Sequence, residues 1–345
     1  MLRFVVTLAL AALSARAVAA PVKVVTTLPT YASIAEAVGG ERVTAAAISG
    51  PDEDAHFVKP KPSLALMLRD ADLFVTTGLD LELWAPVLVD KSGNRRIRDG
   101  QPGFVAASQG VPLLDVPASA SREAGDVHAF GNPHIHTSPL NVKTVAGNIA
   151  AGLARVDPGG AEHYRRGLAD FRRRIDEALY GKRLLAVLPS ETLDPLARSG
   201  KLVPFLGQRE YQGRPLLDRL GGWLGAGLAF RGREIVTYHK NWVYFAELFG
   251  LTVVDHVEPK PGIPPSARHV HHLLRTIERR EIAVILAASY FDPRKPRDIA
   301  ERTGARAIVV PLQPGGSRAR DYFALLDLWT GELAKAFATS RAGHP

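Results

Sequence analysis

The first part of the chain alternates between the hydrophobic pattern of buried strands and that of amphipathic helices. A β-branched run at 22–27 predicts a strand, and helical spacing of apolar residues follows over 30–40. The same order then repeats, with a strand at 42–49, a short helix at 61–71 and a strand at 72–78. This alternation is typical of a parallel sheet with helices on both faces.

The pattern returns in the last third of the chain, where strands again alternate with helices. The strands are predicted at 233–239, 251–259, 282–289 and 305–312, and a closing helix at 321–338. Between the two alternating parts lie two helices, 141–157 and 160–181, and the second is long, charged and amphipathic. We therefore predict an α/β protein with two lobes, each a parallel sheet flanked by helices, joined by one long rigid helix.

The same patterns suggest domain boundaries. We predict an N-terminal lobe at 20–155, a linker helix at 156–182 and a C-terminal lobe at 232–345. The segment 183–231 is less regular and rich in Leu, Gly and Arg, so we interpret it as an insertion. No repeat of about 20–50 residues occurs, which argues against a solenoid.

The N-terminus has the pattern of a cleavable signal peptide over residues 1–19. Arg3 supplies a positive charge, 4–13 is apolar but too short to cross a bilayer, and 17–19 (Ala-Val-Ala) fits a cleavage site. A buried N-terminal helix is the alternative, but the strand at 22–27 begins directly after the break. No cysteine follows the apolar run, so we expect an exported protein without a lipid anchor.

Composition narrows the possible chemistry. The chain has no cysteine, which excludes thiolate metal sites, disulfides and thiol catalysis, so a transition-metal site must use His, Asp, Glu or water. The formal charge is +8, but the arginines alternate with Asp and Glu, as in 164–179. We interpret these as solvated helix faces and expect no nucleic-acid partner.

Three histidines stand where ligands of open α/β sheets usually bind, beyond the carboxyl ends of strands. His56 follows the strand at 42–49, His134 lies in a Gly/Pro-defined loop before a helix, and His239 ends the strand at 233–239. A cleft between the lobes would bring them together, and three neutral imidazoles with a water or carboxylate suit Zn²⁺. The alternative for each is an ordinary hydrogen-bonded histidine.

Several motifs around these histidines occur in a particular order. They are GPDEDAHFVKPKPS, DLFVTTGLDLELW, GNPHIHTSPLN and IVTYHKNWVYFAELFGLTVVDHVEPKPGIPPS. With them, the chain resembles the zinc- and manganese-binding substrate-binding proteins of ABC uptake systems, the periplasmic solute-binding proteins of the cluster A-I type. The resemblance covers most of 22–182 and 232–338. It implies two α/β metal-binding lobes with one ion in the cleft, and a location in the periplasm.

The resemblance also implies ligands. His56 matches the family histidine before a Pro-x-Pro-Ser tract, His134 that of an Asp-Pro-His motif, and His239 that of a Tyr-His motif. His136 stands where the family usually has an aromatic residue. His128 lies in a short loop where family members often carry a long His-rich loop, so a metal-scavenging loop is not supported.

The fourth ligand is left open by the sequence. The family commonly has an acidic residue after the last strand, but this chain has Gln313 there. Asp292 is our tentative fourth ligand, although it also fits a helix cap before Pro293. His136, Glu258 or a water could complete the shell instead.

A His-rich site favours Zn²⁺, with Mn²⁺ possible, because Mn²⁺ prefers oxygen donors. The resemblance implies a high-affinity periplasmic receptor that binds a divalent metal ion and delivers it to the membrane permease of an ABC importer. We expect a monomer without enzymatic activity, and the ATPase on another chain because GxxxxGK[ST] is absent. One alternative is a secreted three-His zinc hydrolase, which would need a general base beside the metal. Another is a receptor for a metal chelate, in which the three histidines would be incidental.

Overall fold

The computed structural model describes residues 20–117, 128–260 and 262–341. The predicted signal peptide, 1–19, lies outside these residues. Within the described ranges, no helix combines the length and the apolar character needed to cross a membrane.

The N-terminal lobe contains a four-stranded parallel sheet in the order β2-β1-β3-β4. Its strands are β1 (Val22–Thr26), β2 (Val43–Ala47), β3 (Leu73–Thr76) and β4 (Phe104–Ala106). Its helices are α1 (Pro29–Gly39), α2 (Pro62–Arg69) and α3 (Ala85–Ser92). The sequence pattern did not indicate β4, because three residues are too few to show a period.

The C-terminal lobe contains a second four-stranded parallel sheet, in the order β10-β9-β7-β8. Its strands are β7 (Glu234–Thr237), β8 (Thr252–His256), β9 (Val284–Ala288) and β10 (Arg306–Val310). Its helices are α10 (Val243–Phe249), α11 (Ala267–Arg280), α12 (Arg294–Thr303) and α13 (Tyr322–Arg341). The prediction of two parallel sheets flanked by helices is confirmed.

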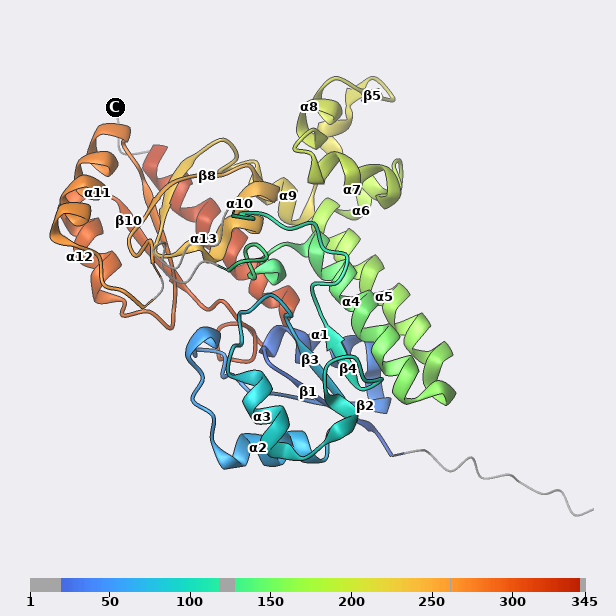
Figure 1. Ribbon diagram of the computed structural model, residues 1–345. Helices are drawn as coiled ribbons and strands as arrows, with labels where there is room; N and C mark the ends of the chain where they lie inside the picture. The colour runs from blue at the N-terminus through green and yellow to red at the C-terminus, as the bar shows by residue number, and fades with distance from the viewer. Residues whose placement is uncertain (1–19, 118–127, 261, 342–345) are drawn as a thin grey trace, which may run out of the picture.

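The long helix α5 (Ala161–Tyr180) packs side by side with α4 (Pro139–Val156), and the pair forms the green column in Figure 1. The side chain of Lys143 on α4 makes an ion pair with Asp176 on α5, and burial raises the pKa of that carboxyl. The Arg172 guanidinium of α5 also donates to the backbone carbonyl of Lys143. The joining helix is therefore stiffened by a partner along its length.

The predicted insertion, 183–231, folds into short elements at one end of α5 (Figure 1). They are α6 (Lys182–Leu185), α7 (Ser190–Arg198), α8 (Leu202–Gly207), β5 (Glu210–Tyr211), β6 (Arg214–Pro215) and α9 (Gly222–Gly227). The indole N–H of Trp223 on α9 donates to Asp327 on α13, at 2.7 Å. This segment thus contacts the C-terminal lobe as well as the helix pair.

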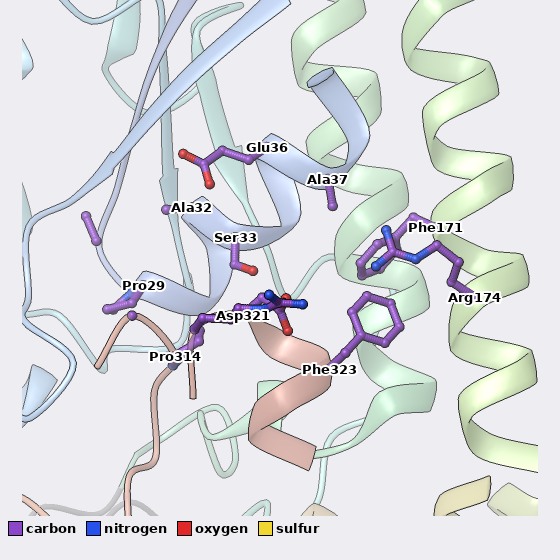
Figure 2. Close-up of a pocket in the computed structure, with 13 residues that line it drawn as sticks. Pro29, Ala32, Ser33, Glu36, Ala37, Phe171, Arg174, Pro314, Asp321 and Phe323 are labelled. Atoms are coloured by element: carbon purple, nitrogen blue, oxygen red, sulfur yellow. The ribbon is translucent and has the colours of Figure 1, made fainter. Parts of the chain in front are cut away.

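Polar contacts also join the two lobes directly. The Gln313 side-chain oxygen accepts from the Thr30 hydroxyl at 2.7 Å, and the Ser289 hydroxyl donates to Asp52 at 2.6 Å. A cavity of about 440 Å³ lies beside these contacts, between α1, α5 and the start of α13 (Figure 2). The Arg174 guanidinium lies 4.3 Å from the centre of the Phe323 ring there. None of the candidate metal ligands lines this cavity.

The carboxyl ends of β1 and β3 are held together by one buried carboxylate, that of Glu82. It accepts from the hydroxyls of Thr27 at 2.6 Å, Thr76 at 3.0 Å and Thr77 at 2.7 Å. It also accepts from the backbone N–H of Thr77 at 3.1 Å. Glu82 therefore fixes the strand ends from which the loops toward the cleft depart.

We predict that Glu82→Ala lowers the free energy of unfolding by about 3 kcal/mol, because it leaves buried hydroxyl and N–H groups without their acceptor. Urea unfolding followed by circular dichroism measures this loss. Glu36→Ala is the matched control, since Glu36 is exposed, and such changes usually stay within about 0.5 kcal/mol. Equal unfolding midpoints for Glu82→Ala and the unaltered protein would contradict the assigned role.

Candidate metal centre

The structure brings His56, His134 and His239 together at the carboxyl ends of the two sheets. The ring centres of His56 and His134 lie 5.3 Å apart, and the His239 ring lies 6.4 Å from the first and 6.5 Å from the second. His56 belongs to the N-terminal lobe and His239 to the C-terminal lobe, while His134 precedes α4. The three rings thus meet between the lobes.

His56 lies in a single 3₁₀ turn, Ala55–Phe57. The Asp54 carboxylate accepts from the His56 backbone N–H at 3.0 Å and from ring nitrogen Nδ1 at 2.6 Å. The indole N–H of Trp84 donates to the backbone carbonyl of Ala55 at 2.7 Å. Backbone and ring are therefore both held in place.

His134 is held in the same way by a different residue. The side-chain oxygen of Asn132 accepts from the His134 backbone N–H at 3.0 Å and from Nδ1 at 3.1 Å. The amide nitrogen of Asn132 donates to the backbone carbonyl of Lys240, which fixes which way the amide points. This last bond also ties the loop to the C-terminal lobe.

His239 lies in extended backbone two residues after the end of β7, with φ of −142°. Its Nδ1 donates to the backbone carbonyl of Glu258 at 2.9 Å. The neighbouring strand β8 leads into Glu258, so the parallel pairing of β7 and β8 sets this contact. The Glu258 carboxylate itself accepts from the Gly262 N–H and the Tyr238 hydroxyl.

All three rings therefore donate Nδ1–H to an oxygen, and this leaves the Nε2 lone pair available in each. Histidines that bind metals characteristically have this arrangement, because the second N–H fixes the tautomer and the ring orientation. At His134 the Nε2 accepts from the Asn241 amide at 3.0 Å, which agrees with a lone pair at that atom. The geometry supplies three oriented nitrogen donors.

Burial also keeps the imidazoles of His134 and His239 neutral. The His134 and His239 residues are 3% and 4% exposed. Burial lowers the pKa of His134 well below its ordinary value and lowers the pKa of His239 to about 4. Since only a neutral imidazole coordinates a metal, both are in the binding form at neutral pH.

The two candidates for a fourth ligand have other partners in the structure. His136 is fully buried, and its Nε2 lies 3.0 Å from the Gln313 amide nitrogen, which donates to it. Asp292 accepts from the Arg294 backbone N–H at 3.0 Å and from its guanidinium at 2.7 Å. This bond to Arg294 lowers the pKa of Asp292 to about 2, and 35% of its side chain is exposed. The contacts of Asp292 are those of the helix-capping alternative.

Sequence reasoning assigned no role to His128, yet the structure places it beside the rings of His56 and His134. Its Nε2 lies 3.2 Å from the Nε2 of His56, and its ring centre lies 5.3 Å from that of His56 and 6.4 Å from that of His134. The only sequence signal was its place in the same loop as His134. A loop has no period that predicts which way a side chain points.

The rings lie slightly farther apart than in a closed metal shell. In a tetrahedral site with Zn–N bonds of about 2.0–2.1 Å, the centres of coordinating rings lie about 5 Å apart. Across the part of the chain that the structure describes, no three His, Asp or Glu side chains already stand at coordinating distances. Closure over an ion therefore needs movements of about 1 Å at the longer ring separations.

Comparison with known proteins decides the family. The family model for the zinc-uptake complex component A periplasmic matches residues 24–180 and 214–336, which is most of the chain. The chain belongs to this family. Its members are metal-binding components of ABC importers, as the sequence motifs predicted. The model leaves 181–213 unmatched, a segment that overlaps the predicted insertion.

The curated proteins that are similar to this chain are named for different metals. The chain is 25% identical over 323 residues to the iron-binding protein YfeA of Yersinia pestis, covering 91% of this chain and 86% of the relative. It is 22% identical over 268 residues to the high-affinity zinc uptake protein ZnuA of Bacillus subtilis, covering 76% and 69%. It is 27% identical over 159 residues to the manganese lipoprotein PsaA of Streptococcus anginosus, covering 45% and 48%.

Solved structures share the fold. A zinc-bound ZnuA deletion mutant has a TM-score of 0.66 at 20% identity, covering 92% of this chain and 98% of that one. A manganese-bound periplasmic metal-binding protein of Candidatus Liberibacter asiaticus has a TM-score of 0.63 at 18% identity, covering 92% and 99%. At these identities the likeness extends to the fold and leaves the metal to be argued from the site.

We predict that the metal-free protein loses stability as the pH falls from about 6.5 to about 4. Burial lowers the pKa of His136 to about 3 and that of His239 to about 4, against about 6.5 in an unfolded chain. Within this pH window His136 and His239 are protonated in the unfolded chain but stay neutral in the folded chain. Lowering the pH therefore favours unfolding.

Urea unfolding midpoints at about pH 7 and about pH 4.5 measure this effect on protein treated with a chelator. His136→Asn removes one of the two groups, so its midpoint should depend less on pH. A midpoint for the unaltered protein that is equal at both pH values would contradict the prediction.

Proposed function

We propose that this protein is a periplasmic receptor that binds one divalent metal ion, zinc, through the Nε2 atoms of His56, His134 and His239. It then delivers the ion to the membrane permease of an ABC importer. The observation that carries the proposal is the fixed acceptor on each Nδ1, namely Asp54, Asn132 and the Glu258 carbonyl. Three rings oriented in this way suit a metal-binding site rather than a set of unrelated core residues.

The donor set favours zinc. Imidazole nitrogen suits Zn²⁺, while Mn²⁺ prefers carboxylate, carbonyl and water oxygens. Around the three rings, the nearby carboxylate of Asp54 is engaged by the Nδ1 of His56. An ion at this place takes the His134 lone pair that now accepts from Asn241, so that hydrogen bond is exchanged for a metal bond.

The two alternative functions fit the geometry less well. A zinc hydrolase needs a carboxylate base beside the metal-bound water, but Asp54 is bound to His56 and Glu258 to Gly262 and Tyr238. A chelate such as haem would interpose its own atoms between the metal and the protein. Ring centres 5.3–6.5 Å apart suit a single bare ion instead.

We predict that the mature protein, purified without a His-tag, carries about one zinc per chain and that His239→Ala loses it. In the proposed site His239 is the ligand from the C-terminal lobe. Its removal therefore leaves an ion held by the N-terminal lobe and the loop of His134 alone. Elemental mass spectrometry measures the metal content of both proteins after dialysis against zinc.

His271→Ala is the matched control for this experiment, because His271 lies exposed on α11, and it should keep the zinc. Absence of bound metal from the unaltered protein, with no thermal shift on adding zinc or manganese, would overturn the proposed function. Binding of a haem or siderophore chelate by that same metal-free protein would then favour the chelate alternative.

We also predict that Asp54→Ala weakens zinc binding by about 10–100-fold without removing a ligand. The Asp54 carboxylate fixes the tautomer and orientation of His56, and the loss of such an outer partner typically costs this much affinity. Competition with a chromophoric chelator measures the dissociation constants. Asp70→Ala, which alters an exposed carboxylate paired with Arg69 in the same lobe, is the control and should change the affinity much less.

A further inference from the structure

Two ring nitrogens from different segments meet in the cleft, those of His56 and His128. Their Nε2 atoms lie 3.2 Å apart and form a hydrogen bond, which an ion bound to both would replace. In a tetrahedral zinc site with bonds of about 2.0–2.1 Å, neighbouring ligand atoms lie about 3.3 Å apart. The pair therefore already has the separation of two ligands on one ion.

The backbone explains how His128 reaches the rings. The carbonyl of His128 accepts from the N–H of Gly131 at 3.1 Å, which makes a tight turn just before His134. Gly131 has a φ of +114°, and a Cβ there would lie 3.0 Å from the Leu114 carbonyl oxygen. This turn folds the loop back so that His128 and His134 lie near each other, with ring centres 6.4 Å apart.

We propose that His128 is the fourth ligand and that the receptor holds its ion with four imidazoles. This inference rests on the proposed function. His128 comes from the loop before α4, so the ion has ligands from the N-terminal lobe, this loop and the C-terminal lobe. With His128 in the shell, Asp292 and His136 keep their partners Arg294 and Gln313.

A four-imidazole shell would make the site more selective for zinc over manganese, because it offers no oxygen donor. Four protein ligands also fill the coordination shell, as in structural zinc sites. A closed shell leaves no position for a metal-bound water, so a hydrolytic reaction has no nucleophile.

The test compares His128→Ala with the unaltered protein, with His271→Ala as the matched control at an exposed histidine. Zinc K-edge X-ray absorption of the loaded proteins counts coordinated imidazoles, and chelator competition gives the affinities. We expect four imidazoles in the unaltered protein and in His271→Ala, and three in His128→Ala. The zinc affinity of His128→Ala should fall by roughly 10–100-fold or more. That is the loss typical for removing a residue that only hydrogen-bonds a ligand, and His128 would be a ligand itself.

A second variant separates coordination from loop packing. His128→Asp supplies an oxygen donor at the same place, so the preference for zinc over manganese should narrow relative to the unaltered protein. A change confined to packing would weaken both metals alike.

An unchanged imidazole count and affinity in His128→Ala would overturn the fourth-ligand proposal, while loss of zinc in His239→Ala would leave the proposed function standing. Retention of full zinc affinity in both variants would overturn the proposed function as well.

Discussion

The imidazoles of His56, His134 and His239 each have one ring nitrogen hydrogen-bonded to a fixed oxygen, and the remainder of the site follows from that constraint. Asp54, Asn132 and the Glu258 carbonyl accept from the three Nδ1 atoms. A ring whose Nδ1–H is held this way has one tautomer and one orientation, and its Nε2 keeps a lone pair. Burial then keeps the imidazoles of His134 and His239 uncharged, so the site is prepared chemically as well as geometrically.

The fold supplies these oxygens because parallel strands end together. β7 and β8 lie side by side, so the loop after β8 presents the Glu258 carbonyl to His239, in the loop after β7. In the other lobe, Glu82 joins the ends of β1 and β3, and Trp84 nearby holds the turn that carries His56. A buried carboxylate and one indole N–H thus help to determine where His56 stands.

Sequence reasoning recovered the parts of the protein that have a period. The two parallel sheets and the long helix followed from alternating apolar runs, and the family motifs gave three histidines that the structure brings together. The strand β4 and the short helices of 183–231 are too brief to show a period. The place of His128 near the other rings could not be predicted, because it depends on the turn at Gly131. Asp292 was ambiguous for a different reason, since a carboxylate suits both a metal ligand and a helix cap.

The paired helices α4 and α5 have a consequence for the speed of exchange. A stiff spine and polar contacts such as Thr30 with Gln313 keep the lobes near their final separation, so capture requires adjustments of about an ångström rather than a domain rotation. With the proposed ligands, the arrival rate would depend mainly on how fast the ion sheds its water, and release would depend on how fast the lobes separate. Because His56 and His239 stand on opposite lobes, a partner that contacts both lobes would then set the residence time of the ion by separating them.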